Sequence, residues 1–489
     1  MARGRRWALG LGLFALSVGT SCQLVSGVGD YSFGAGGAGG AGGATGGAGG
    51  SGGAAPCAGA SFCGLWAVTF PVTGSLAASR TDALAREGAA TVAVGEFAGT
   101  GTFAPGVTVP ATGLSDFFAV RVQDDGQKEL VATYGGNALD MLAGFAAVDF
   151  GGHYWVAGSN VGSPSFGGQA LQGTGVFLAH FGPNVDAVVP FPTPSINGGE
   201  LGALAVDAAG NLYTAGSFGG SVDLGLGSMA ATALDGLVVA LDPQGALRWV
   251  VQLGGAGDQR ARGVAVDADG SVVVGGDYQN ALVHHGQPEP GSASGDGFVL
   301  RLAALDGQAV DFRRITGASG SRAVRAVSRA GSSLLVAGDF SGQSDIAGTP
   351  QTASDTREAF VAELGPSLDT TWHVGIGGNT VLLQAVALDV AGGRITLAMR
   401  CPSQIRFDGK TILGGAGSNV CLAQLTEAGA PLWAASLGDD LDQTVTSVRA
   451  LPDGAVVGGS ASGDLDLGDV VLHASSTRQE AYVFRFVAP

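Results

Sequence analysis

The sequence predicts an all-β protein: a seven-bladed β-propeller of four-stranded antiparallel blades, closed by an N-terminal strand that pairs with the C-terminal strands. Two observations support this fold class. Two short apolar phrases each recur seven times at nearly constant intervals, and a strand-like segment before the first repeat matches a strand that is missing after the last. Regular repeats of this kind indicate repeated supersecondary units, and four strands per unit are typical of propeller blades.

The first phrase consists of two or three apolar β-forming residues followed by a glycine-rich strand end. It recurs around Gly95, Gly158, Gly216, Gly276, Gly338, Met399 and Gly459, at intervals of 63, 58, 60, 62, 61 and 60 residues. The second phrase, which reads DGFVLRL from Asp296, follows each copy of the first. Runs rich in Val and Phe between Gly, Asp and Asn clusters predict strands and turns.

The best-formed repeat contains the four strands that one blade requires. They are predicted at residues 262–266, 272–278, 298–302 and about 310–315. The tight turn DADG joins the first two strands, and a long loop over 279–295 joins the second and third. In an up-and-down blade, these long loops and the loops between blades leave the sheet on the same face, so we expect binding at that face and at the mouth of the axial channel.

Closure of the ring follows from a count of the fourth strands. This phrase occurs six times. Trp249, Trp372 and Trp433, together with Trp66 in the segment before the first repeat, share one repeat position, which predicts core residues and no ligand platform. A seventh copy is missing after EAYVFRF, yet LWAVTFPV at 65–72 has no partner of its own. We therefore expect 65–72 to lie beside 482–486, which removes the last exposed sheet edge.

The turns AVDAAGN and AVDADGS, together with the DGFVxxL strands, resemble the SBBP-type β-propeller repeats of bacterial surface proteins. The resemblance covers about residues 65–489. The whole layout also resembles uncharacterised lipoproteins of Gram-negative bacteria. These resemblances imply an envelope protein and carry over no catalytic residue.

The N-terminus is typical of an export signal. Arg3, Arg5 and Arg6 precede an apolar run over 7–18, and small residues then lead to Cys22. This pattern predicts a signal peptide over 1–21, because a dozen apolar residues are too few to span a bilayer as a helix.

The end of this signal resembles that of a lipoprotein, with Gly19 where such signals carry Leu. The resemblance implies acylation of Cys22, and Gln23 beside it implies an outer-membrane lipoprotein of the cell envelope. The body then faces either the periplasm or the outside. The alternative is a secretory peptide cut nearby, which leaves Cys22 as an ordinary thiol.

The chain is organised in three parts. After the signal, residues 22–56 are the lipidated N-terminus and a nearly pure Gly/Ala segment, which predicts a flexible linker because it has no side chains to bury. Residues 57–489 form the propeller.

Composition excludes some functions. The chain has 24 Lys and Arg against 41 Asp and Glu, and loss of the three arginines in 1–21 leaves 21 against 41, or −20. Such a surface repels nucleic-acid phosphates and anionic lipid. Hydrophobic residues make up 46% and charged residues 13%, too apolar for a disordered chain.

Four cysteines remain after Cys22. We predict the disulfides Cys57–Cys63 and Cys401–Cys421, because both pairs are close in sequence and the signal indicates an oxidising compartment. Neither pair has a histidine near it in sequence, as a metal site would favour.

An acidic residue recurs before the first strand of several units. The positions are Asp82, Asp140, Asp258 and Asp442, with Glu200 at a similar place. A ring of carboxylates at the channel mouth would hold a cation; the alternative, which we favour, is that each residue caps backbone N–H groups in its loop. The adjacent pair His284 and His285 is the remaining metal candidate, but neighbours on a strand point in different directions.

These observations predict a non-enzymatic binding scaffold without a cofactor. It would be a monomer that presents its long-loop face to a protein or glycan. Two alternatives stay open: a propeller enzyme, such as a glycan lyase or hydrolase, acting at the channel mouth, and a spacer with no specific ligand. Fold alone does not separate them.

Overall fold

A computed structural model describes most of the repeat region. It covers residues 62–136, 146–150, 153–160, 165–166, 169–170, 175–181, 185–190, 200–353, 356–377, 383–401 and 404–488. Every regular element in these residues is a β-strand. None of these residues forms a helix long and apolar enough to cross a membrane. The predicted signal peptide and linker lie outside them.

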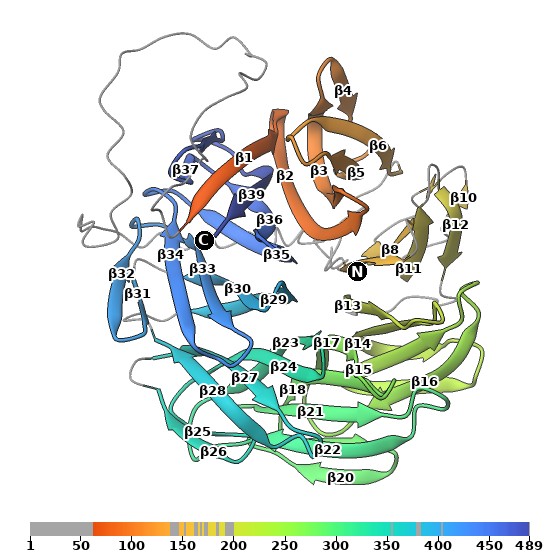
Figure 1. Cartoon of the computed structure of the whole chain (residues 1–489). Coiled ribbons are helices and arrows are strands. Elements are labelled where there is room, and N and C mark those ends of the chain that lie inside the picture. The colour runs from red at the N-terminus through yellow and green to blue at the C-terminus, as the bar shows by residue number, and fades with distance from the viewer. Residues whose placement is uncertain are drawn as a thin grey trace, which may run out of the picture.

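Seven four-stranded antiparallel sheets are arranged radially around a central axis, as predicted (Figure 1). Blade 1 contains β2 (Val72–Glu87), β3 (Ala90–Ala104), β5 (Asp116–Val122) and β6 (Lys128–Tyr134), with β4 (Val107–Pro110) paired to β3. Blade 2 contains β7 (Ala146–Phe150), β8 (His153–Asn160), β11 (Gly175–Phe181) and β12 (Val185–Pro190). Blade 3 contains β13 (Glu200–Val206), β14 (Leu212–Asp223), β15 (Ser228–Leu241) and β16 (Leu247–Leu253).

The remaining blades follow the same order from the axis outward. Blade 4 contains β17 (Gln259–Val266), β18 (Val272–Tyr278), β21 (Asp296–Leu302) and β22 (Ala309–Ile315). Blade 5 contains β23 (Arg322–Ala330), β24 (Ser333–Phe340), β27 (Glu358–Leu364) and β28 (Thr370–Ile376). Blade 6 contains β29 (Gln384–Ala391), β30 (Arg394–Cys401), β33 (Asn419–Thr426) and β34 (Pro431–Leu437).

Blade 7 joins the two ends of the propeller. Its strands are β35 (Gln443–Leu451), β36 (Gly454–Ala461), β39 (Glu480–Val487) and, outermost, β1 (Cys63–Phe70). Trp66 pairs with Arg485 and Thr69 with Tyr482 in the antiparallel register. The closure predicted from the missing seventh strand is confirmed, and in Figure 1 the red β1 lies beside the blue β39.

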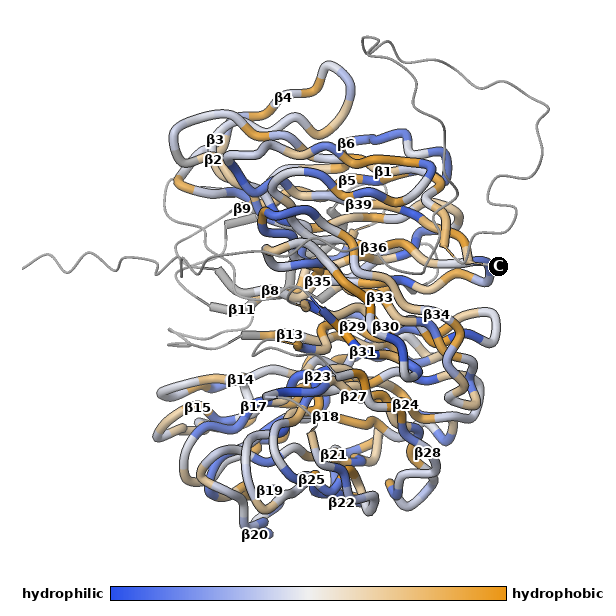
Figure 2. The backbone as a smooth tube through the Cα atoms, turned by 90° about the vertical axis from the view of Figure 1, so that its left-hand side faces the viewer, coloured by the Kyte–Doolittle hydropathy of each residue, from blue (hydrophilic) through white to orange (hydrophobic). Residues whose placement is uncertain are grey.

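The core is divided into seven layers, one between each pair of neighbouring blades. For example, Trp249 and Tyr213 of blade 3 pack with Val274 and Phe298 of blade 4 in one buried cluster. Both faces of a blade are therefore covered, so all seven residues of β21 are buried. The side view in Figure 2 shows hydrophobic residues within strands such as β33 and β36. This arrangement explains why the repeats are continuous apolar runs without an alternation of polar residues.

The long connections contain more structure than the sequence predicted. The segment expected to be a loop in blade 4 forms a hairpin of β19 (Ala281–His284) and β20 (Gln287–Pro290). Blades 2, 5, 6 and 7 carry the equivalent hairpins β9 (Ser165–Phe166) with β10 (Gln169–Ala170), β25 (Gln343–Ile346) with β26 (Thr349–Thr352), β31 (Gln404–Phe407) with β32 (Lys410–Leu413), and β37 (Asp464–Asp466) with β38 (Val471–His473). Isolated bridges such as Gly254 with Val283 join such a hairpin to the preceding blade.

The long connections and the between-blade loops share one face of the propeller. The amide of Gln279, which begins the long connection of blade 4, donates to the carbonyl of Asp258 at 2.9 Å. The same bond joins Ser341 to Ser321 and Ser462 to Asp442, each at 2.9 Å. We call this the long-loop face; the tight turns lie at the opposite ends of the strands.

Candidate functional site

In six of the seven blades, the described part of the innermost strand contains a β-bulge that places one residue at the axis. The inner strands shift register at Asp82, Gly202, Arg262, Arg325, Val386 and Thr446. The corresponding position in blade 2 lies outside the described residues. A bulge leaves one residue out of the ladder and re-aims its side chain, so these positions vary without loss of the sheet.

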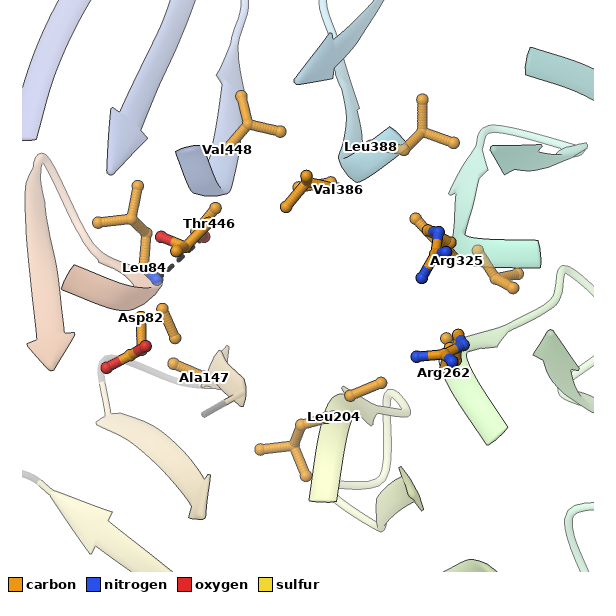
Figure 3. Close-up of a pocket in the computed structure, with 18 of the residues that line it drawn as sticks. Asp82, Leu84, Ala147, Leu204, Arg262, Arg325, Val386, Leu388, Thr446 and Val448 are labelled. Carbon is orange, nitrogen blue, oxygen red and sulfur yellow. Dashed lines mark hydrogen bonds between the residues drawn. The ribbon is translucent and has the colours of Figure 1, made fainter. Parts of the chain in front are cut away.

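These bulge residues line a cavity on the axis. Its volume is about 150 Å³, and all seven blades contribute to its wall. Figure 3 shows Arg262 and Arg325 on one side of the channel and Asp82 with Thr446 on the other. The bulges lie near the beginnings of the inner strands, so this cavity is on the long-loop side of the channel.

The two arginines at bulge positions, Arg262 and Arg325, are each bound by an aspartate of the second strand. Arg262 Nε donates to Asp277, and Arg325 Nε donates to Asp339. Asp339 also binds Arg357 at 3.0 Å and is almost fully buried. A carboxylate that binds Nε fixes the plane of a guanidinium. The side-chain carbonyl of Gln384 in blade 6 accepts from the terminal nitrogens of Arg325, Nη1 at 2.8 Å and Nη2 at 3.0 Å.

Asp82 faces the channel from blade 1, and its carboxylate lies in a different electrostatic environment from the two arginines. Its carboxylate accepts from Arg80, whose Nη2 also lies 3.2 Å from Glu96. Burial raises the pKa of Asp82 to about 7; Arg80 opposes this shift and Glu96 adds to it. Asp82 therefore titrates near neutral pH, where its charge decides part of the field in the cavity.

The polar side chains of blade 7 are bound to backbone. Thr446 Oγ1 donates to the carbonyl of Thr81 at 2.6 Å, and Ser447 Oγ accepts from the amide of Leu84 at 3.2 Å. Arg449 donates to the carbonyls of Leu84 at 2.8 Å and Ala147 at 2.5 Å. These bonds join blade 7 to blades 1 and 2 across the inner strands.

The channel widens toward the tight turns. A second cavity of about 450 Å³ lies there, also on the axis. Its charged lining residues are Arg86, Asp207, Arg329, Asp389 and Arg449. Asp207 is a turn residue: its Oδ1 accepts from the amides of Ala209 and Asn211, both at 2.9 Å.

No protein-family model matches this chain, and no curated protein matches it. A protein of unknown function from Dyadobacter fermentans aligns over 88% of this chain and 100% of its own, at 8% identity and a TM-score of 0.39. The endosialidase of phage phi92 aligns over 88% of this chain and 70% of its own, at 9% identity and a TM-score of 0.41. A prolyl endopeptidase aligns over 85% of this chain and 51% of its own, at 12% identity and a TM-score of 0.42. Likenesses this distant carry no argument about function.

The predicted carboxylates do not occupy one repeat position. Asp82 is a bulge residue inside β2, whereas Asp258 and Asp442 precede β17 and β35 and lie on the long-loop face. Asp140 lies outside the described residues, as does the side chain of Glu200. No group of three or more His, Cys, Asp or Glu side chains that could hold a metal occurs in the described part of the chain.

Asp258 and Asp442 bind backbone amides, but these amides are not in the loops of Asp258 and Asp442 themselves, where the favoured alternative placed them. Asp442 Oδ1 accepts from the amide of Ser418 at 3.2 Å, and Asp258 Oδ1 accepts from that of Leu234 at 3.4 Å. These amides belong to the preceding blade. Asp258 also forms an ion pair with Arg260 at 2.7 Å. The two residues thus join neighbouring blades.

The two adjacent histidines occupy different environments, because β19 ends at His284 and His285 lies in the turn that follows. His284 is buried against Phe312, with ring centroids 4.8 Å apart, and burial lowers its pKa. His285 has a positive φ of 49° at the tip of the β19–β20 hairpin. Their ring centroids are 5.9 Å apart and the rings are nearly perpendicular.

The Cys401–Cys421 disulfide is present, with Cα atoms 5.8 Å apart. It crosses diagonally between β30 and β33, because Cys421 is paired with Met399. Cys57 and Cys22 lie outside the described residues, so the Cys57–Cys63 disulfide and the lipidation remain predictions.

The channel arginines are the site residues that sequence reasoning missed. Part of the signal was available: aligning the inner strands on their last paired residues places Asp82, Arg325 and Thr446 in one column, with Arg262 one residue out of step. That column is not recognisable as a channel position until the bulges are known, because an ideal strand would place it by simple alternation.

Proposed function

We propose that this chain is an exported, lipid-anchored protein of the cell envelope whose propeller is a non-enzymatic binding module. In this proposal the signal over residues 1–21 and acylation at Cys22 attach it to the outer membrane. The Gly/Ala segment then separates the propeller from the membrane. The likeness of the repeats to SBBP-type surface proteins supports the same assignment.

One observation carries the binding role: the bulges of the inner strands bring charged groups from several blades into a cavity on the axis. Arg262 and Arg325 are each held by a carboxylate, and the hydroxyls of Thr446 and Ser447 are bonded to backbone. This arrangement favours positioned recognition groups over a nucleophile activated by a base. The ligand would enter from the long-loop face.

Two exposed leucines on opposite faces allow a matched test. Leu441 is 36% exposed beside Asp442 on the long-loop face, and Leu305 is 80% exposed in a tight turn of blade 4. A photo-crosslinking amino acid at Leu441 should yield a discrete adduct in intact cells. The same group at Leu305 should yield none. Equal crosslinking at both positions, or none at either, would contradict binding at the long-loop face.

Membrane attachment is tested in the same cells. Wild-type protein should partition with the outer membrane, whereas Cys22→Ser should be recovered in the soluble fraction. Protease treatment of intact cells then tells whether propeller peptides are released outside. A Cys22→Ser protein that remains in the membrane would contradict the acyl anchor.

A further inference from the structure

A further cavity lies on the long-loop face between blades 3 and 4. Its volume is about 420 Å³, a size that accommodates a small ligand. β15 and β16 of blade 3 and the β19–β20 hairpin of blade 4 form its wall. None of its lining residues also lines the axial cavities. The cavity is therefore a separate place where this face can bind a molecule.

Asp235 supplies the charge of this cavity. It is 4% exposed and belongs to the lining. Its Oδ2 accepts from Nε2 of Gln252 at 2.5 Å, whereas its Oδ1 has no hydrogen-bond partner among the described residues. Burial raises the pKa of Asp235, and the bond from Gln252 opposes the shift. A buried carboxylate that no cation pairs with is costly to keep charged, so a cation beside it would stabilise it.

The equivalent carboxylate in blade 4 has the cations that Asp235 lacks. Asp296 begins the third strand of that blade and is 2% exposed. Arg322 of the next inner strand binds its Oδ1 at 2.9 Å. Arg314 of the outer strand lies 3.5 Å from its Oδ2. Blade 4 therefore neutralises this buried position with its own and its neighbour's side chains.

Glutamine replaces both arginines around Asp235. Gln252 occupies in β16 the position that Arg314 occupies in β22. Gln259 begins β17 as Arg322 begins β23. Gln259 donates its amide protons to two backbone carbonyls, at 3.2 and 2.9 Å, and so gives none to the carboxylate. The place of the cation is thus left open in blade 3, next to a cavity.

The acceptors at this place suit a primary ammonium group. Gln252 donates both amide protons, to Asp235 and to the carbonyl of Ala230 at 3.0 Å. Its side-chain carbonyl accepts no bond from the described residues and is left for a ligand. Asp235 Oδ1 and the hydroxyl of Thr232 add two acceptors to the lining. An ammonium group has three donors and no acceptor, which matches this set.

Other cations fit less well. A guanidinium binds best through both oxygens of a carboxylate, but Oδ2 of Asp235 is already bound to Gln252. A quaternary ammonium prefers aromatic faces, and none of the lining residues is Phe, Tyr or Trp. Calcium takes six to eight oxygen ligands, several of them carboxylates, whereas Asp235 is the one carboxylate of the lining.

We propose that the cavity between blades 3 and 4 binds a primary ammonium group at Asp235. The formal net charge of −17 favours the approach of such a cation. This site goes beyond the proposed function, which rests on the axial cavity. An amino sugar and an alkylamine of the lysine type share this chemistry, so the experiment includes both.

The test is calorimetric titration of the purified full chain with D-glucosamine and with n-butylamine, which represents a lysine side chain. N-Acetyl-D-glucosamine is the uncharged counterpart of glucosamine, and choline carries the charge without an N–H donor. We expect at least one of the two primary amines to bind. N-Acetyl-D-glucosamine should not bind, and choline should bind roughly tenfold more weakly or less. The amine that binds identifies the source of the ammonium group.

Three variants locate the site. Asp235→Asn keeps the shape of the side chain and removes its charge, so binding should weaken roughly tenfold or more. Gln252→Arg supplies the cation that blade 4 has at this position and should also block binding; it keeps the test decisive if Asp235→Asn fails to fold. Asp223→Asn is the control, because Asp223 carries the same charge in the exposed β14–β15 hairpin, where it accepts from the amide of Gly225 at 2.8 Å. Melting temperatures show which variants are folded.

The proposal is overturned if neither primary amine binds, or if a folded Asp235→Asn or Gln252→Arg variant binds as the wild type does. Equal binding of choline would contradict recognition through N–H donors. Weakened binding in Asp223→Asn would assign the effect to the net charge of the blade. Crosslinking at Leu441 without amine binding would remove this inference and leave the proposed function standing. Amine binding without that crosslinking would do the reverse.

Discussion

At the scale of single residues, the bulge positions allow the side chains that line the channel to vary while the inner strands keep their pairing. Asp82, Arg262, Val386 and Thr446 share one structural position although they differ in charge and polarity. Since the bulged residue is outside the ladder, its side chain can change while the strand still pairs. This freedom gives one seven-fold scaffold an asymmetric channel.

Asp82 should make stability depend on pH. Its pKa is raised to about 7 in the folded chain and is about 4 in an unfolded one. Between these values the folded state binds a proton that the unfolded state has lost, so the free energy of unfolding should fall as pH rises from about 4 to about 7. At about 1.4 kcal/mol per unit, the decline is at most about 4 kcal/mol.

Asp82→Asn should remove this part of the slope and raise the melting temperature at pH 8 relative to the wild type. Asp125→Asn, in an exposed turn, is the control and should leave the slope unchanged. The measurement is melting temperature against pH from 4 to 8. A slope that Asp82→Asn retains in full would assign the pH dependence to other groups.

A second residue-scale feature is a buried polar side chain at the first position of three inner strands. Arg322 is fully buried and donates to Asp296 at 2.9 Å and to Ser344 at 3.0 Å. Gln259 and Gln443 take this position in blades 4 and 7, where each donates to a backbone carbonyl. Breaking a buried ion pair leaves an uncompensated charge, so the Arg322–Asp296 pair resists separation of blades 4 and 5.

At the scale of elements, the outer strand of one blade packs beneath a turn of the next. Trp249 lies under Gly307, Trp372 under Gly429 and Trp66 under Gly126. Each of these glycines has a positive φ. The tryptophans are therefore interblade core residues, as their shared repeat position predicted, and the turn requires glycine for both its conformation and its contact.

Gly307→Ala tests this contact against a matched glycine. A Cβ at Gly307 would lie 2.8 Å from Trp249 Cε3, whereas a Cβ at Gly270 would meet nothing within 4 Å. Both positions have positive φ, 71° and 84°. Gly270→Ala should cost about 1–2 kcal/mol from backbone strain, and Gly307→Ala about 1–3 kcal/mol more from overpacking. Equal losses in thermal unfolding would show that the tryptophan moves aside freely.

At the scale of the whole molecule, the ring is closed by strands from opposite ends of the chain. Phe62 packs between blades 6 and 7, and Trp66 and Phe70 pack between blades 7 and 1. Without β1, the outer edge of β39 would be unpaired and three aromatic side chains would lose their sites. Closure thus stabilises two interblade layers at once.

Deletion of residues 62–70 should therefore destabilise the entire propeller. At about 1.5–3 kcal/mol for each large side chain, the loss is on the order of 5 kcal/mol, and the exposed edge should promote aggregation. Deletion of residues 34–55 is the control and should leave melting unchanged. A peptide spanning 62–72 should restore part of the lost stability. Wild-type melting of the 62–70 deletion would show that closure contributes little.

The sequence by itself determined the number of blades, the four strands of each, and the closing pairing of β1 with β39. These features depend on short-range patterns, namely apolar runs and turn residues, that recur often enough to be counted. The Cys401–Cys421 disulfide was predictable for the same reason, because its cysteines lie in neighbouring strands of one repeat.

Only the tertiary structure decided which residues meet on the axis. The acidic residues that looked equivalent in sequence, such as Asp82 and Asp258, are separated between the channel and the long-loop face. Arg262 and Arg325 come together because two bulges, 63 residues apart, face the same space. Bulges and contacts between blades depend on packing across the whole ring, which no local pattern of residues records.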